Sequence, residues 1–303
     1  MEYGAHLVAV IPTHGRPDLL GRTLASVAAC ARPAGYGGCL VVENGPRAGA
    51  EAVVAGAARA HPGAGFRYLH HGRANKSAAL NAALAGVPDG ALCVFFDDDV
   101  RVEPGTLAAY ARFALGTGER AHFGGAVLPT YETPPDEWLA PSLPYSVTGF
   151  GRAQFSQAGF FLGANWAAQR GHIVGAGGFD PEFGPGSATG ARGQEKQMQL
   201  RLCDAASAPV WVEGAVVHHA VPPERCSPQW AARRAFQMAV QDGTSARRRG
   251  QYGPLKRSVR MVPSNVAGLV RAATRGRQAR WSVSIKLAHN IGVLRGYMSR
   301  WGG

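Results

Sequence analysis

The chain has 303 residues, a length typical of one or two domains, and its hydrophobic fraction of 46 % excludes a disordered or fibrous protein. No apolar run is long enough to span a membrane, and the first residues lack the basic start and cleavage site of a signal peptide. The five cysteines are scattered and never spaced as CxxC, which argues against disulfides and against a zinc site. We therefore expect a cytoplasmic protein.

Positive charge is concentrated in the last quarter of the chain, although the whole chain carries a net charge of +12. Residues 1–225 hold 17 Lys and Arg against 19 Asp and Glu, whereas residues 226–303 hold 15 against the single acid Asp242. A basic segment of this kind favours phosphate-bearing partners such as anionic lipid or nucleic acid. We predict a main domain over 1–225 and a basic helical extension over 226–303.

Strand and helix patterns alternate over the first hundred residues. Uninterrupted apolar runs predict strands, and apolar residues at spacings of three and four predict helices. In chain order these segments are a strand at 6–12, a helix from Pro17, strands at 39–42 and 66–70, a helix at 76–86 and a strand at 91–96. This order indicates an α/β fold with a mostly parallel sheet of nucleotide-binding topology.

The middle of the chain is less regular. Five prolines between residues 129 and 144 exclude a regular element there. Beyond them the pattern predicts a helix over 194–206 and a strand over 210–219.

The basic extension reads as helical. Ser227-Pro228 suits the cap and first turn of a helix over 228–242. Further along, 281–294 places four apolar residues near one helical face, namely Trp281, Ile285, Ala288 and Val293. That face either lies in a lipid headgroup layer, as a peripheral contact with anionic membrane, or packs on the rest of the protein.

Three consecutive carboxylates, Asp97, Asp98 and Asp99, follow the apolar strand at 91–96. In an extended chain alternate side chains share a face, so Asp97 and Asp99 can point at one position. Like charges this close repel one another unless a cation lies between them. The pattern favours a site for Mg²⁺ or Mn²⁺ held by carboxylates and substrate phosphates, and the alternative is a solvated acidic loop.

A histidine pair, His218-His219, closes the later strand. One of the two imidazoles would be a suitable third ligand for a divalent ion such as Mn²⁺. Read alone, a histidine pair is more often an ordinary surface or core feature than a pair of metal ligands.

Taken together, these segments resemble glycosyltransferase family 2, the nucleotide-sugar transferases with the GT-A fold. The resemblance covers nearly the whole chain. It is carried, in order, by VAVIPTHGRPDLLGRTLASV, VVENGP, NKSAALNAAL, VFFDDDV, FLGANWAAQRGHIVGAGGFDPEFG and VVHHAVPPER. The family's order implies a nucleotide-sugar-binding half over 1–100 and an acceptor-binding half over 101–225.

The resemblance also implies roles for residues on the donor side. Pro12, Thr13 and Glu43 would border the nucleobase and ribose, with Glu43 in place of the more usual aspartate. Lys76 and Asn81 would lie along the diphosphate, and Asp98 would belong to the nucleotide-sugar site. The divalent metal would be bound by Asp97, Asp99 and His219 or His218.

The acceptor site would be floored by Gly163, Ala164, Asn165 and Trp166, again by resemblance. Trp166 makes physical sense there because an indole face packs on the apolar face of a sugar ring. The alternative is that Trp166 is an ordinary core tryptophan.

The family's catalytic base lies at the start of a helix that carries an arginine, and it usually follows another acid. Here the segment reads GQEKQMQLR, and alignment on Gly193 and Arg201 places Glu195 at the second acid. This position is expected to deprotonate the acceptor hydroxyl. Gln194 and Gln197 stand where the family commonly has carboxylates, and Lys196 adds a positive charge. All three favour the ionised form of Glu195, which would make it a weaker base.

The sequence therefore predicts a metal-dependent, inverting glycosyltransferase that moves a sugar from a nucleoside-diphosphate sugar to a hydroxyl acceptor. A nucleotidyltransferase could share the sheet and the acidic strand end, but the loop PTHGRPDLL lacks a glycine-rich basic signature. A nucleic-acid-binding protein is the other alternative, prompted by the basic extension. We do not expect nucleic acid as a partner, because the extension shows no aromatic stacking motif.

Overall fold

The computed structural model describes residues 6–116, 120–188 and 190–298, and within them the chain forms two compact units. Unit 1 holds the described residues up to 130 together with 149–181 and 194–220. Unit 2 holds 131–148, 182–193 and the chain from 221 onwards. Unit 2 thus contains the described part of the basic extension and, in addition, two earlier segments.

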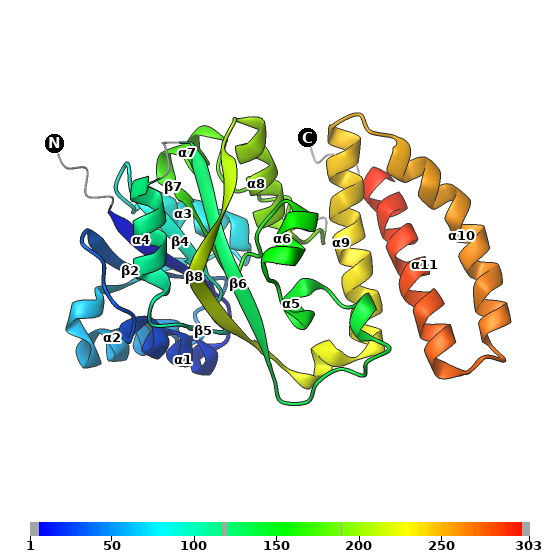
Figure 1. Cartoon of the computed structure of the whole chain (residues 1–303), viewed down its shortest axis with the longest axis horizontal. Coiled ribbons are helices and arrows are strands. Elements are labelled where there is room, and N and C mark those ends of the chain that lie inside the picture. Colours follow the sequence, from blue (N-terminus) through cyan, green and yellow to red (C-terminus); the bar gives the residue numbers. More distant parts are fainter. Residues whose placement is uncertain (1–5, 117–119, 189, 299–303) are drawn as a thin grey trace. The chain divides into compact units, whose positions relative to one another are not determined.

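One eight-stranded sheet forms the centre of unit 1, with the order β3-β2-β1-β4-β7-β6-β8-β5 (Figure 1). The strands are β1 (Leu7–Thr13), β2 (Tyr36–Asn44), β3 (Phe66–His71), β4 (Leu92–Phe96), β5 (Val100–Val102), β6 (Ala121–Tyr131), β7 (Asn165–Gln169) and β8 (Ala208–Val221). The first four strands of the order pair in parallel, whereas β7 joins β4 and β6 in antiparallel fashion. The predicted α/β fold is confirmed.

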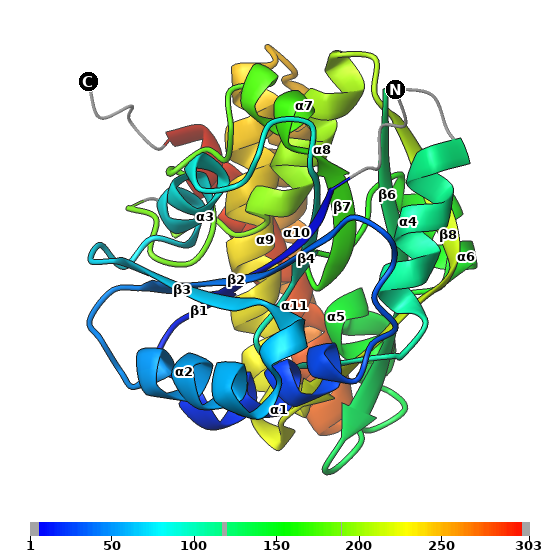
Figure 2. The same ribbon diagram turned by 90° about the vertical axis from the view of Figure 1, so that its left-hand side faces the viewer.

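Helices cover both faces of the parallel strands: Figure 2 shows α1 and α2 on one face and α3 on the other. The helices of unit 1 are α1 (Pro17–Ala28), α2 (Ala50–Ala60), α3 (Lys76–Ala85), α4 (Thr106–Gly116), α6 (Arg152–Ala158), α7 (Arg170–Gly175) and α8 (Gln194–Asp204). Because the sheet is covered on both faces, every residue of β1 and of β4 is buried. This explains why these strands read as continuous apolar runs.

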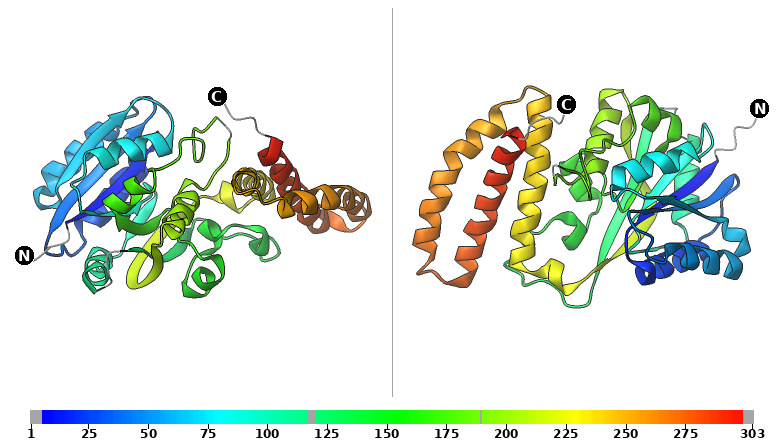
Figure 3. Two further views of the ribbon diagram at one scale, coloured as in Figure 1. Left: turned by 90° about the horizontal axis from the view of Figure 1, so that it is seen from above. Right: turned by 180° about the vertical axis from the view of Figure 1, so that it is seen from behind.

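Unit 2 is built around helices of the basic extension. Its helices are α5 (Tyr145–Thr148), α9 (Pro228–Arg248), α10 (Gly253–Ala272) and α11 (Gly276–Met298). Figure 3 shows α11 between α9 and α10. The α9–α11 contact is close because glycines line it, and a Cβ at Gly292 or Gly296 would overlap the backbone of α9. Ser227 caps α9 as predicted, with its hydroxyl accepting from Trp230 N.

The apolar face predicted for 281–294 packs inside unit 2. Ile285 is buried with Leu139, Leu143 and other apolar side chains, and Val293 is buried against Ala239 of α9. This face of α11 is therefore not available to lipid, so the packing alternative holds for it. Among the described residues, no helix is long and apolar enough to cross a bilayer.

His122 on β6 generates a prediction about stability. The ring is fully buried, with Nδ1 3.1 Å from the Ser207 hydroxyl, and burial lowers its pKa from the ordinary 6.5 to about 4. Because the unfolded chain binds this proton more readily, the stabilising contribution is present above pH 6.5 and is lost as the pH falls towards 4. The loss is expected to reach about 3 kcal/mol.

Urea unfolding of the wild type and of His122→Gln, followed between pH 7.5 and about 4, measures this contribution. The variant is expected to show a shallower loss of unfolding free energy on acidification, whatever its own stability. Equal pH slopes for the two proteins would contradict a depressed pKa at His122.

Candidate active site

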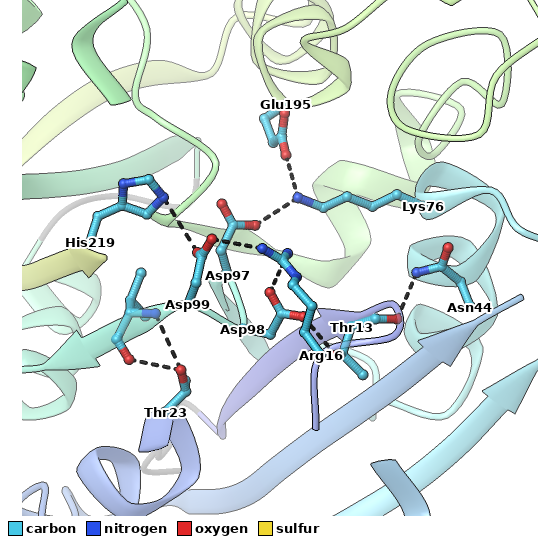
Figure 4. Close-up of polar contacts among 11 residues, drawn as sticks. Thr13, Arg16, Thr23, Asn44, Lys76, Asp97, Asp98, Asp99, Glu195 and His219 are labelled. Atoms are coloured by element: carbon cyan, nitrogen blue, oxygen red, sulfur yellow. Dashed lines mark hydrogen bonds and ion pairs between the residues drawn. The ribbon is translucent and has the colours of Figure 1, made fainter. Parts of the chain in front are cut away.

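The polar residues singled out by the sequence gather where neighbouring strands end. β1 and β4 are parallel neighbours, so their carboxyl ends lie at the same edge of the sheet. β1 is followed by Arg16 and β4 by the three aspartates. Figure 4 shows these side chains beside Lys76, Glu195 and His219. All of them belong to unit 1.

Arg16 neutralises two of the aspartates. Its guanidinium lies 2.5 Å from Asp98 Oδ1 and donates to Asp99 Oδ2 at 2.9 Å. The Thr13 hydroxyl donates to the other Asp98 oxygen at 2.6 Å. Burial raises the pKa of Asp98 to about 6, although Arg16 opposes this shift. Burial also works to lower the pKa of Arg16, but the aspartates outweigh it and the guanidinium stays charged.

Lys76 joins the third aspartate to the candidate base. Its ammonium lies 2.7 Å from Asp97 Oδ1 and 2.9 Å from Glu195 Oε1 (Figure 4). Burial works to lower the pKa of Lys76, but the charges of Asp97 and Glu195 raise it above its ordinary value. Lys76 is the first residue of α3, where a positive charge opposes the helix dipole, so the two carboxylates are needed to hold it there. Asn75 caps this helix by accepting from Ala78 N.

Glu195 lies in the first turn of α8, where the helix dipole favours a carboxylate. Gln194 donates to Glu195 Oε1 at 2.6 Å, which gives this oxygen a second donor beside Lys76. The carboxyl group lies directly against Gly163, and a Cβ at that position would overlap it. The Lys196 ammonium lies over the Phe160 ring, 5.2 Å from its centre.

Strand register decides which histidine joins the site. β5 and β8 pair with Val100 opposite His219, and His219 Nε2 lies 3.4 Å from Asp99 Oδ1. His218 points away on the alternate face of β8, where its Nε2 lies 2.6 Å from Glu103 Oε1. Of the two predicted alternatives, His219 is therefore the one that lies against Asp99, and its role as a ligand stays a prediction.

The residue types at this edge suit a divalent cation, although their side chains are not gathered around one position. In the described parts of the chain, no three His, Cys, Asp or Glu side chains are clustered closely enough to hold a metal ion. Instead Arg16 and Lys76 balance the carboxylate charge. Asp97, Asp99 and His219 nevertheless supply two carboxylates and an imidazole, ligand types that suit Mn²⁺.

The residues predicted beside the nucleoside are buried and bonded within the protein. Pro12 and Thr13 lie in β1, and Thr13 O accepts from the Asn44 amide at 2.8 Å. Glu43 accepts from Ala48 N at 2.7 Å and from the Tyr68 hydroxyl at 2.5 Å. Burial and this hydrogen bond raise the pKa of Tyr68 to about 12. The three predicted residues therefore lie in the interior of the protein beneath the carboxyl ends of the strands.

Asn81, predicted along the diphosphate, joins α3 to the segment that precedes α8. Its amide donates to Phe179 O and accepts from Phe179 N, both at 2.7 Å. The nitrogen and the oxygen of the Asn81 amide are thus both hydrogen-bonded to the backbone of Phe179.

The predicted acceptor floor separates into two parts. Asn165 and Trp166 lie in β7 and are fully buried. Asn165 accepts from the Tyr110 hydroxyl, and the Trp166 ring stacks on Phe95 with centroids 4.7 Å apart. In this structure both side chains thus belong to the core, and Trp166 agrees with the alternative of an ordinary core tryptophan.

Gly163 and Ala164 precede β7 in the chain, and of these Gly163 adjoins Glu195. Gln199 of α8 holds the same segment through two hydrogen bonds to the backbone of Phe161. The helix that carries the candidate base thus also fixes the segment against which that base lies.

Arg16 and Gln194 belong to the polar cluster around the aspartates and Glu195, but neither was predicted from the sequence as a site residue. Arg16 could have been predicted from its position in the chain. It is the first cationic residue after β1, and the aspartates follow the neighbouring strand β4. Gln194 was interpreted only as a lost carboxylate, and its amide donation to Glu195 depends on how α8 begins.

A family model described as "Glycosyltransferase like family 2" matches residues 5–173, more than half of the chain. The chain belongs to this family. The predicted activity, nucleotide-sugar-dependent glycosyl transfer, is confirmed at this level. The nucleotidyltransferase alternative is thereby set aside. No curated protein sequence compared with the chain matched it.

Several solved structures are similar in fold to this chain. The mannosyltransferase PcManGT from Pyrobaculum calidifontis, in complex with GDP-Man and Mn²⁺, has a TM-score of 0.62 at 18 % identity, over 97 % of this chain and 86 % of that one. GalNAc-T7 with UDP, GalNAc and Mn²⁺ has a TM-score of 0.54 at 12 % identity, over 80 % and 51 %. S. aureus TarS has a TM-score of 0.50 at 14 % identity, over 81 % and 43 %. The predicted GT-A fold is confirmed.

Gly163 provides a test of how tightly the glycosyltransferase site is built. Gly163→Ala is expected to push the Glu195 carboxylate away from Lys76, because the new Cβ would overlap it. A misplacement of about 1 Å lowers turnover by about 10²-fold. Steady-state kinetics measure the effect, with Gly171→Ala as control because a Cβ there meets nothing within 4 Å. Normal turnover of Gly163→Ala would show that the position of Glu195 is not critical.

Proposed function

We propose that this glycosyltransferase is metal-dependent and inverting, and that Glu195 is its catalytic base. One observation carries the proposal: the Lys76 ammonium lies between Asp97 and Glu195, 2.7 and 2.9 Å from their oxygens. A carboxylate from α8 is thereby brought next to the acidic end of β4. A donor whose diphosphate lies at that strand end would present its sugar near Glu195.

The donor side combines several groups that favour an anion. Lys76 begins α3 and Glu195 lies in the first turn of α8, so two helix N-termini meet at the cluster. Helix N-termini attract phosphate through their unpaired N–H groups and dipoles. Lys76 and Arg16 add two fixed positive charges. These groups would hold a nucleoside diphosphate at the end of the sheet.

A divalent ion, Mn²⁺ or Mg²⁺, would be held by Asp97, Asp99 and His219. When bound, it would neutralise charge on the two phosphates as the nucleoside diphosphate leaves. Lys76 and Arg16 now balance these aspartates, so their cationic groups would be released to contact phosphate oxygens.

Glu195 would accept the proton of the acceptor hydroxyl as that oxygen attacks the anomeric carbon. Two donors, Lys76 and Gln194, bind Oε1 and so orient the carboxyl group. Gly163 leaves room beside it. Attack from the face opposite the leaving group in a single displacement inverts the anomeric configuration.

Donor binding can be tested without knowledge of the acceptor. Thermal stabilisation by GDP-sugars and UDP-sugars, with and without Mn²⁺, identifies a donor by mass action. The anomeric configuration of the sugar first released when water acts as the acceptor, followed by NMR with that donor, then tests inversion. Retention of configuration would overturn the single-displacement mechanism, and metal-independent donor binding would overturn the role of the cation.

Glu195→Gln isolates proton acceptance. The amide keeps the shape of the carboxyl group but cannot take the proton, so turnover is expected to fall about 10²–10⁴-fold. Donor affinity, measured by calorimetry, should change little. Glu213→Gln is a matched control, because Glu213 is exposed and pairs with Arg152. If Glu195→Gln turns over like the control, another group is the base.

Metal removal and Asp99→Ala should have the same effect. Both are expected to abolish transfer and to weaken donor binding together, because the diphosphate loses its bridging cation. Asp204→Ala, at the exposed end of α8, serves as control. Transfer at the full rate in excess EDTA would contradict metal dependence.

A further inference from the structure

Helix α10 has an unusual distribution of side chains. Its fully buried residues are small or polar, namely Ser258, Asn265 and Ala272. Larger apolar residues such as Leu255 and Leu269 are partly buried, and Leu255 packs in the core of unit 2. The exposed face carries further large apolar residues, which a soluble helix normally keeps on the side that faces the core.

Four residues define what we call the outer stripe: Tyr252, just before the helix, and Val259, Val266 and Val270 within it. Their exposed fractions are 58 %, 57 %, 50 % and 73 %. The separations of seven, seven and four residues place them on one side of the helix. They are half of the large apolar residues exposed in the described chain, so the stripe is a concentrated feature rather than scattered exposure.

Positive charges run beside the outer stripe. Lys256, Arg260 and Arg271 are exposed and are separated by four and eleven residues, which places them together on the adjacent side of α10. We call them the basic flank. In residues 226–303 the only acid is Asp242, which lies on α9. The flank therefore keeps its positive potential.

We propose that the outer stripe and basic flank of α10 dock on the surface of an anionic lipid bilayer. The valines and Tyr252 would enter the boundary between headgroups and acyl chains, and the flank would contact lipid phosphates. Within unit 2, α10 packs on α11 (Figures 1 and 3), and the residues of the outer stripe remain exposed.

Charge decides between a bilayer and the other possible occupants. A second copy of this chain that covered the stripe would bring two basic flanks together, and like charges oppose that contact. Nucleic acid would satisfy the flank but would leave the valines without an apolar partner. An anionic bilayer satisfies both features. This proposal does not depend on the proposed catalytic residues, and its readout is binding.

The test uses the full chain and sedimentation with vesicles of phosphatidylcholine, with or without phosphatidylglycerol. Binding is expected only to the anionic vesicles and should decrease at high salt. Val259→Ser/Val266→Ser/Val270→Ser should lower the partition coefficient about tenfold or more, and Lys256→Gln/Arg260→Gln/Arg271→Gln about a hundredfold. All six positions are exposed, so the variants should fold.

Matched controls separate this surface from general charge or apolarity. Val174→Ser removes an exposed valine of α7, and Arg22→Gln/Arg59→Gln/Arg120→Gln removes three exposed arginines of unit 1. Both should bind vesicles like the wild type. In addition, Val266→Trp should show blue-shifted emission, quenched by brominated lipid, on anionic vesicles.

Three outcomes would overturn the proposal. The first is no binding of the wild type to anionic vesicles at low salt. The second is equal binding of the wild type and the serine variant, which would mean that charge alone acts. The third is self-association of the wild type in sedimentation velocity that the serine variant loses, which would identify a second copy as the occupant.

Discussion

Three consecutive carboxylates at the end of a buried strand repel one another, and the site depends on the cations that neutralise them. Asp98 and Asp99 share Arg16, whereas Asp97 shares Lys76 with Glu195. Each of these carboxylates has a cation within 2.9 Å, which offsets part of the cost of their burial. Arg16 and Lys76 would also suit a phosphate-bearing donor, so the same two positive charges would serve both stability and donor binding.

The fold brings these charges together from segments that are far apart in the chain. Parallel pairing of β1 with β4 places Arg16 beside the aspartates, and the β5–β8 register places His219 beside Asp99. Thr23 of α1 fixes the turn after the aspartates by bonding both backbone groups of Val100. Because several elements hold the cluster, small changes such as a Cβ at Gly163 are expected to disturb it.

Unit 2 is held together by apolar packing rather than by a cluster of charges. α9 and α11 approach closely through glycines and bury Val293 and Ile285, whereas α10 turns its valines outward. The helices of the extension therefore differ in role. α9 and α11 contribute to the core of unit 2, whereas α10 leaves apolar residues exposed.

Local pattern determined much about this protein. Continuous apolar runs identified β1 and β4, Pro17 and Ser227 marked helix starts, and the three aspartates marked the functional edge, because such features depend on neighbours in the chain. Tertiary structure alone decided which of two adjacent histidines faces Asp99, since strand register sets this. It also decided that Trp166 is enclosed by Phe95 and that α10 rather than α11 exposes its apolar side. Periodicity identifies an apolar face, but what covers that face depends on the elements packed against it.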